Sequence, residues 1–368
     1  MNISQLGWNP FFNEHFNKLN NREFLPARVS LEHKDRYQIW CEQGEMMAEV
    51  SGRFRHEAQS RADFPVVGDW VAIASRLAEN RATIHQLLPR KTIFSRKAIL
   101  SGGMPDTGGK TDQQVLAANV DTVFLVSGLD GDYNVRRMER YMTVAWDSGA
   151  RPVIVLNKVD LCPDIDDVIV EVQAIAFGVT ILAISAFQNQ GLETISQQLE
   201  AGKTAVFLGS SGVGKSTIIN HLLGEERLKT KEVRAYDDRG RHTTTSREML
   251  LLPSGGIVID TPGLRELQLW DNETGLSRVF ADIEELARHC RFRDCEHVNE
   301  PGCAVRTAIN DGKLDAKRFE NYLKMKKELR YLESRKDIKA QRQTEREFTR
   351  RIHKMLKERE DLKKKGLI

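Results

Sequence analysis

Eight consecutive residues, Gly209 to Ser216, have the sequence GSSGVGKS, which is the pattern of a phosphate-binding loop. In such a loop the backbone N–H groups face phosphate oxygens at a helix N-terminus, where the helix dipole also favours negative charge. We expect Lys215 to contact the β- and γ-phosphates of a nucleotide and Ser216 to bind Mg²⁺. The candidate phosphate contacts are Gly209, Ser210, Ser211, Gly212, Val213, Gly214, Lys215, Ser216 and Thr217.

A second motif, NKVD at Asn157 to Asp160, indicates which base is bound. The carboxylate of Asp160 can accept from the N1–H and the exocyclic amine of guanine together, and adenine offers no such pair of donors. A buried polar contact of this kind discriminates strongly between ligands, so guanine is predicted over adenine. Asn157 and Lys158 complete the motif, and we expect Ser185 and Ala186, which follow the next apolar run, to support the base from its other side.

Two further segments are predicted to contact the γ-phosphate and its metal ion. In DTPG, Asp260 to Gly263, we expect Asp260 to hold Mg²⁺ through water and the Gly263 N–H to contact the γ-phosphate. RGRHTTT, residues 239–245, lies where a first switch loop should be, and Thr244 is our preferred Mg²⁺ ligand, with Thr243 close behind.

The catalytic residue is less clearly marked. Leu264 follows DTPG, and a leucine cannot orient water as the glutamine of Ras-like enzymes does at this position. His242 is the candidate, because an imidazole that is uncharged near neutral pH can orient or deprotonate a nucleophile. The alternative is a switch-loop histidine that packs or contacts a partner.

Apolar runs that precede these motifs are expected to position them. Runs at 152–156, 179–184, 204–208 and 256–260 read as buried strands, and parallel strands place the residues after their carboxyl ends at one edge of a sheet. The order of the motifs is unusual, because NKVD precedes the phosphate loop. A GTPase domain whose ends were moved to a surface loop explains this order, since the same strands can occupy the same places.

A group of metal-binding residues follows the nucleotide motifs. Within fourteen residues the chain has three cysteines and a histidine, which form a complete tetrahedral ligand set for one structural Zn²⁺: Cys290, Cys295, His297 and Cys303. Disulfides are the alternative, but nucleotide chemistry and the lack of a secretion signal favour a reducing compartment.

These residues together resemble the circularly permuted, ribosome small subunit-dependent GTPase A family. The resemblance is carried by VGDWV (67–71), FSRKA (94–98), AANVD (117–121), GRHTTT, DTPG and CRFRDCEH with EPGC. It implies an OB-fold, a permuted GTPase domain and a zinc module that act in late maturation of the small ribosomal subunit. It also implies that His242 is catalytic and that the subunit stimulates hydrolysis.

We therefore predict a multidomain chain. The expected parts are an N-terminal extension (1–24), an all-β OB-fold barrel (25–100), a linker (101–114), a permuted α/β P-loop GTPase domain (115–275), a mainly helical zinc module (276–335) and a basic helical tail (336–368). Five short apolar runs between 27 and 88 support the barrel. Trp40 is as consistent with the barrel interior as with a stacking platform for RNA.

Charge is distributed unevenly along the chain. Residues 317–368 contain 19 Lys/Arg and 9 Asp/Glu, although the net charge of all 368 residues is only +3. We interpret the end of the chain as two helices, the first docking on the zinc module. Both can neutralise RNA phosphates, and an ordinary solvated charged helix is the alternative.

A chain of 368 residues is long enough for two or three domains, and its 40% hydrophobic content suits globular modules rather than disorder. No uncharged apolar run approaches the length of a membrane span, so we expect a cytoplasmic protein with no membrane partner. The nucleotide motifs predict GTP or GDP as ligands, the family resemblance implies the small ribosomal subunit and its rRNA as partners, and we expect a monomer. Two other hypotheses remain open. One is an RNA-binding scaffold whose guanine-nucleotide site regulates docking with little turnover, and the other is an ATP-dependent enzyme.

Overall fold

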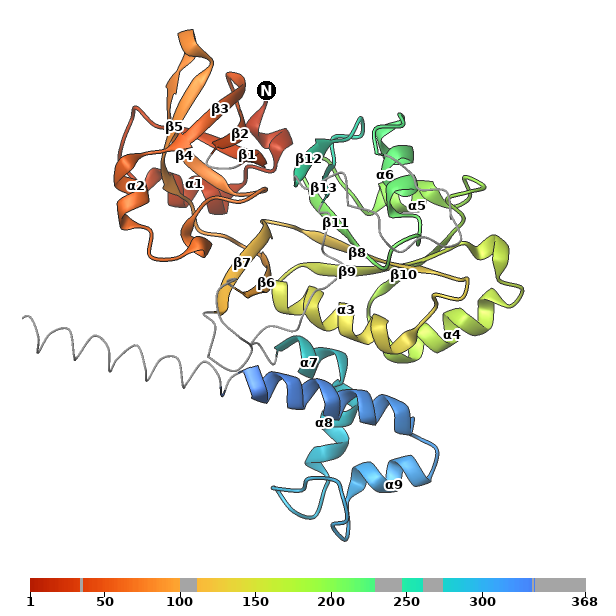
Figure 1. Cartoon of the computed structure of the whole chain (residues 1–368). Helices are drawn as coiled ribbons and strands as arrows, with labels where there is room; N and C mark the ends of the chain where they lie inside the picture. The colour runs from red at the N-terminus through yellow and green to blue at the C-terminus, as the bar shows by residue number, and fades with distance from the viewer. Residues whose placement is uncertain (34–35, 100–110, 229–246, 261–273, 333, 335–368) are drawn as a thin grey trace, which may run out of the picture.

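The computed structural model describes residues 1–33, 36–99, 111–228, 247–260, 274–332 and 334. Three bodies are visible in Figure 1: a small barrel, a sheet with helices on both faces, and a helical module. No helix within the described ranges combines the length and the apolar composition that a membrane crossing requires.

The barrel closes on itself through five strands. These are β1 (Leu25–His33), β2 (Arg36–Cys41), β3 (Gly44–Val50), β4 (Trp70–Arg76) and β5 (Arg81–Leu87). The order is β1-β2-β3-β5-β4, and an additional pairing of β4 with β1 removes the free edge. Alternate residues point inward, so that Val29, Ile39, Ile73 and Ile84 are fully buried. This closed five-stranded arrangement confirms the predicted OB-like barrel.

Trp40 lies outside the barrel core. It belongs to the same apolar cluster as Trp8, Phe12 and Trp70, whereas its neighbours Ile39 and Cys41 point into the barrel. Alternation along β2 explains this placement, because successive side chains face opposite sides of a strand. The residue is buried against other parts of the chain and offers no exposed stacking platform.

The N-terminal segment covers this outer face of the barrel. Helix α1 (Pro10–Asn17) follows Trp8, whose ring centroid lies 4.7 Å from that of Trp70 in an edge-on arrangement. Arg28 is buried beneath it and donates to the carbonyl oxygens of Leu6, Gly68 and Asn119. Because those carbonyls come from three different parts of the chain, this one guanidinium joins the N-terminal segment to the barrel and to the start of the next domain.

The second domain is built on a mainly parallel sheet. Its strands are β8 (Thr122–Gly128), β9 (Arg151–Asn157), β10 (Thr180–Ile184), β11 (Thr204–Leu208), β12 (Glu248–Leu251) and β13 (Ile257–Asp260). The order is β10-β9-β8-β11-β13-β12, with β12 antiparallel to β13. The strands that precede β11 in the chain lie on one side of it, and those that follow lie on the other. This is the permuted GTPase topology that the motif order predicted.

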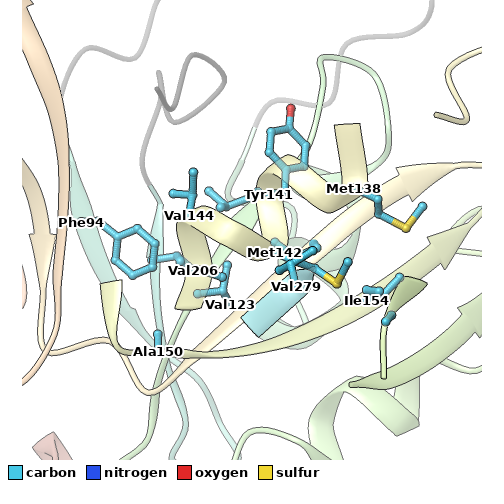
Figure 2. Close-up of a cluster of buried hydrophobic side chains, with 14 of the residues drawn as sticks. Phe94, Val123, Met138, Tyr141, Met142, Val144, Ala150, Ile154, Val206 and Val279 are labelled. Atoms are coloured by element: carbon cyan, nitrogen blue, oxygen red, sulfur yellow. The ribbon is translucent and has the colours of Figure 1, made fainter. Parts of the chain in front are cut away.

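Helices cover both faces of the sheet (Figure 1). They are α3 (Val135–Ser148) and α4 (Ile165–Ile175) on one face, and α5 (Leu192–Gln197) and α6 (Lys215–Leu223) on the other. Figure 2 shows Met138 and Met142 of α3 above Val123, Ile154 and Val206 of three adjacent strands. The apolar face of α3 is therefore fixed against the strands that end at the nucleotide motifs.

The barrel and the second domain share one hydrogen-bonded sheet. Leu31 of β1 pairs with Glu248 of β12, and Arg247 forms an ion pair with Glu32 at 3.3 Å. A hairpin of β6 (Ile93–Ile99) and β7 (Thr111–Ala118) also lies between the domains. Residues 111–114, which we assigned to a linker, belong to β7, because they pair with residues 96–99 of β6.

The third body is helical. It contains α7 (Thr274–Val279), α8 (Ala281–Arg288), α9 (Ala304–Asn310) and a helix that begins at residue 316 and continues to 332. Phe280, Ile283, Val305 and Leu329 are completely buried in its core. The predicted basic helical tail, 336–368, lies outside the described residues.

Candidate functional site

The phosphate loop connects β11 to α6, as the sequence predicted. Ser211 and Gly212 are exposed, whereas Val213 is buried and anchors the loop in the apolar layer beneath α6. Lys215 Nζ donates to the carbonyl oxygens of Gly209 at 2.8 Å and Ser210 at 2.5 Å. The ammonium group therefore lies over the loop, where phosphate oxygens would be received.

Two glycines of this loop are required by its geometry. Gly209 has φ +153°, and a Cβ there would lie 2.3 Å from the carbonyl oxygen of Val126. Gly214 has φ +97°, and a Cβ there would lie 2.3 Å from Asn157 Nδ2. Side chains at either position would therefore push the loop away from β8 or from the base-binding motif.

Asn157 joins three of the predicted motifs. Its side chain is buried, its Nδ2 donates to the carbonyl oxygen of Val213 at 2.7 Å, and its Oδ1 accepts from the N–H of Ala186 at 2.9 Å. The NKVD segment, the phosphate loop and the SA segment are thus held in one cluster. Because the Ala186 N–H donates to Asn157, this N–H positions the SA segment against NKVD.

The next residues of NKVD lie in a constrained turn at the end of β9. Lys158 adopts φ +67°, a left-handed conformation that is uncommon for a residue with a side chain and costs of order 1 kcal/mol or more. Its Nζ forms an ion pair with Asp130 that holds this conformation. Asp160 is exposed, and its Oδ1 accepts from the hydroxyl of Ser185. The carboxylate is therefore both accessible and oriented.

Asp130 and Asp132 are site residues that the motifs did not reveal. They follow β8, and Asp132 accepts from the hydroxyl of Ser210 in the phosphate loop. Burial raises the pKa of Asp130, but the hydrogen bond from Lys158 and the N–H of Asp132 outweigh it, so that the pKa is lowered. The sequence could have indicated these two residues, because they follow the apolar strand β8. This strand is fully buried and lies next to β11.

Asp260 ends β13, the strand next to β11, and so lies at the same edge of the sheet as the phosphate loop. Burial raises the pKa of its carboxyl group, Glu248 raises it further, and Lys215 opposes both. Such a carboxylate would gain from a nearby cation. The other predicted residues of this part of the site, His242, Thr244 and Gly263, lie outside the described residues.

The Cys/His residues form a compact cluster between α8 and α9. The ligand atoms of Cys290, Cys295, His297 and Cys303 all lie within 4.8 Å of one another. Cys290 Sγ is 3.6 Å from His297 Nδ1 and 3.9 Å from Cys303 Sγ, and His297 Nδ1 is 3.4 Å from Cys303 Sγ. A tetrahedral zinc ion gives edges of about 3.8 Å between two sulfurs and about 3.6 Å between sulfur and nitrogen. The three separations among Cys290, His297 and Cys303 fit this geometry, and Cys295 Sγ lies within 4.8 Å of the other three ligand atoms.

Burial lowers the pKa of His297, which favours the neutral imidazole that a metal requires. The ring of Phe319 packs edge-on against that of His297, with centroids 5.9 Å apart. The helix 316–332 therefore docks on this cluster, as predicted.

Buried charges connect the helical module to α3. Glu139 is fully buried and accepts from Arg318 at 2.5 Å, Arg136 at 2.7 Å and Asn321 at 2.6 Å. Arg318 also forms a two-point ion pair with Asp282 of α8. Since Arg137 of α3 forms an ion pair with Asp132 at 2.9 Å, the same helix contacts the nucleotide edge and the metal-binding module.

Known proteins share these features. The family model described as RsgA GTPase matches residues 87–270. The small ribosomal subunit biogenesis GTPase RsgA of Opitutus terrae is 47% identical over 346 residues, which cover 92% of this chain and 92% of that protein. The chain belongs to the RsgA GTPase family. A second RsgA, from Syntrophotalea carbinolica, is 44% identical over 343 residues, or 93% of each chain. Membership in this family makes the protein a GTPase.

Solved structures agree with the fold of an RsgA family member. YjeQ from Thermotoga maritima has a TM-score of 0.60 at 27% identity, over 83% of this chain and 98% of that one. YloQ, described as a circularly permuted GTPase, has a TM-score of 0.59 at 23% identity, over 84% and 96%, and shares the fold. An ABC transporter family model also matches residues 192–363, a stretch that contains the phosphate loop but not NKVD.

Proposed function

We propose that this GTPase is a late-stage assembly and maturation factor of the small ribosomal subunit, in which the subunit stimulates GTP hydrolysis and hydrolysis releases the factor. The printed names of its relatives, small ribosomal subunit biogenesis GTPase, support the partner. The observation that carries the nucleotide part is Asn157, because its two hydrogen bonds unite the base-binding and phosphate-binding motifs.

In the proposed site each motif has one task. Asp160 accepts from guanine N1–H and the exocyclic amine, while Lys158, Ser185 and Ala186 frame the base. Residues 209–217 surround the phosphates, with Lys215 at the β- and γ-phosphates. Mg²⁺ is held by Ser216, by Thr244, and by Asp260 through water. Gly263 contacts the γ-phosphate and His242 orients water.

We infer that the Cys/His cluster holds one structural Zn²⁺. The separations between its ligand atoms support this, and all four positions are protein ligands, which leaves no coordination position for a substrate. The ion would stabilise the junction of α8, α9 and the helix from 316, so that the module presents a fixed surface to rRNA. We expect the protein to act as a monomer in the cytoplasm.

Two measurements test the proposal together. GTP turnover should rise when purified small subunits are added, and cosedimentation with the subunits should be stronger with a non-hydrolysable GTP analogue than with GDP. His242→Ala should lose the stimulated turnover but keep the cosedimentation. If cosedimentation depends on the nucleotide while turnover stays low and His242→Ala changes nothing, the protein is a nucleotide-regulated scaffold instead.

A further inference from the structure

One stretch of the GTPase domain has no positive charge. Between Lys158 and Lys203, residues 159–202 contain seven Asp/Glu and no Lys, Arg or His, in a chain with 55 Lys/Arg. This composition separates the stretch from the rest of a protein whose net charge is positive. The acidic residues are Asp160, Asp164, Asp166, Asp167, Glu171, Glu193 and Glu200.

The acidic stretch forms one end of the sheet. It contributes α4, β10 and α5, and β10 is the last strand in the order, with β9 as its sole partner among the described strands. Helix α4 packs on one face of the sheet beside it and α5 on the other. The turn in which Ser185 pairs with Gln190 closes the carboxyl end of β10. Among the residues that the structure describes, no strand pairs with the other side of the amino-terminal part of β10, from Thr180.

Edge strands of natural proteins are commonly protected by lysine, proline or an inward-pointing charge. The sequence of β10, TILAI, has none of these. Large apolar side chains flank it instead, because Phe177 is 100% exposed and Phe187 is 87% exposed. Val170 on α4 is 64% exposed. An unprotected edge with apolar groups at both ends is suited to receiving an extended chain.

The carboxylates around this edge are available to a cation. Asp160 is assigned to guanine, which leaves six carboxylates for a partner, and of these Glu171 accepts from the uncharged hydroxyl of Tyr133. In the described part of the chain, none of the six forms an ion pair. RNA would be repelled by them, and a second copy of this edge would bring like charges together. The charge therefore favours a positively charged polypeptide.

We propose that the β10 edge, with the acidic α4 and α5 beside it, binds an extended Lys/Arg-rich segment of a partner protein by strand addition. Main-chain hydrogen bonds to β10 supply part of the affinity, and the carboxylates select a basic sequence. Five residues of β10 span about 17 Å, so Phe177 and Phe187 can contact apolar side chains near the two ends of the segment. This surface is separate from the basic helices proposed to face rRNA.

The test uses the full-length protein and a fluorescent peptide of about eight residues that alternates lysine and valine. Fluorescence anisotropy at physiological ionic strength should show saturable binding. Ala183→Lys places a positive charge at an exposed position of β10 and should weaken binding about tenfold. Ala183→Asp should bind at least as well as the unmodified chain. Ala78→Lys makes the same substitution at an exposed position on the barrel and should have no effect.

A second peptide separates strand addition from charge alone. It has the same charge but proline in place of every valine, so it cannot pair with a strand. It should bind about tenfold more weakly. Equal binding of both peptides, or equal weakening by Ala183→Lys and Ala78→Lys, would overturn the proposal. Unchanged GTP turnover and thermal unfolding in Ala183→Lys keep this outcome distinct from a failure of the GTPase assignment.

A photo-reactive benzoylphenylalanine at position 177 identifies the occupant directly. Irradiation should cross-link the valine-containing peptide to the chain. A cross-link to residues 335–368 of the same chain would show that its own basic tail takes the edge, and a cross-link between two copies would show self-association. Either result would refute an external partner.

Discussion

Asn157→Ala is the substitution that most directly separates nucleotide-site organisation from general stability. The alanine keeps the backbone but removes the donor to the Val213 carbonyl and the acceptor from the Ala186 N–H. Since Asn157 is only 2% exposed, water cannot readily replace it. The phosphate loop and the SA segment would then lose the group that connects them.

The expected cost follows from those two bonds. A buried group left without its hydrogen-bond partner costs about 1–3 kcal/mol, and two such groups that share one side chain should together cost about 2–4 kcal/mol. If this free energy appears in nucleotide binding, GDP affinity falls roughly 30- to 900-fold. Isothermal titration calorimetry with GDP measures the change, and urea unfolding measures any loss of stability.

Asn119→Ala is the matched control. Asn119 is also buried and makes two side-chain hydrogen bonds, from the Lys91 N–H at 2.8 Å and to the Gly68 carbonyl at 3.1 Å. It lies before β8, away from the carboxyl ends of the strands. Asn119→Ala should lose at least as much stability as Asn157→Ala, because Asn119 also adopts φ +57°, and only Asn157→Ala should lose GDP affinity. Equal GDP affinities in the two variants would refute the role given to Asn157.

Three further predictions concern the charges and the metal-binding cluster. Arg318→Met removes one partner of the buried Glu139 and should lower the free energy of urea unfolding by about 3 kcal/mol. As a control, Arg288→Met removes an exposed ion pair and should change the free energy of unfolding by less than about 0.5 kcal/mol. Burial raises the pKa of Asp147 to about 7, so the folded chain binds this proton more tightly than the unfolded chain and stability falls as the pH rises from about 4 to 7. Asp147→Asn should remove that part of the decline, and an unaltered pH profile of unfolding would contradict the assignment. Cys303→Ser should reduce bound zinc, measured by mass spectrometry, from about one ion per chain to nearly none and should lower the helical circular dichroism signal; full helicity without metal would contradict a structural role.

Local patterns were enough to predict the barrel and the nucleotide motifs. The alternation of apolar residues predicted the barrel strands to within a few residues, because one face of each strand is buried in a single core. The phosphate loop was predictable for a different reason: its backbone needs glycine at the positions that pack against Val126 and Asn157. Each of these constraints is visible within a short stretch of sequence.

Contacts between distant segments were not predictable in this way. Arg28 occupies a strand position that would ordinarily face solvent, and its burial depends on carbonyls from Leu6, Gly68 and Asn119. The sequence does not indicate that β1 pairs with β12, because either strand could have the same residues at a free edge. From the sequence alone, Glu139 would be assigned to the surface of a helix, because the contact with Arg318 has no local signal.

The central claim is that one guanine nucleotide spans Asp160 and the phosphate loop, and Asp160→Asn tests it most directly. The amide can donate to the O2 of xanthine and accept from its N1–H. In guanine the O2 is replaced by an amine, which is a donor, so the amide NH2 has no acceptor there. Titration with GDP and xanthosine diphosphate should show GDP affinity reduced about 100-fold or more and xanthosine diphosphate affinity increased. If Asp160→Asn binds GDP as tightly as the unmodified chain and still rejects xanthosine diphosphate, Asp160 does not contact the base and the account of the site is wrong.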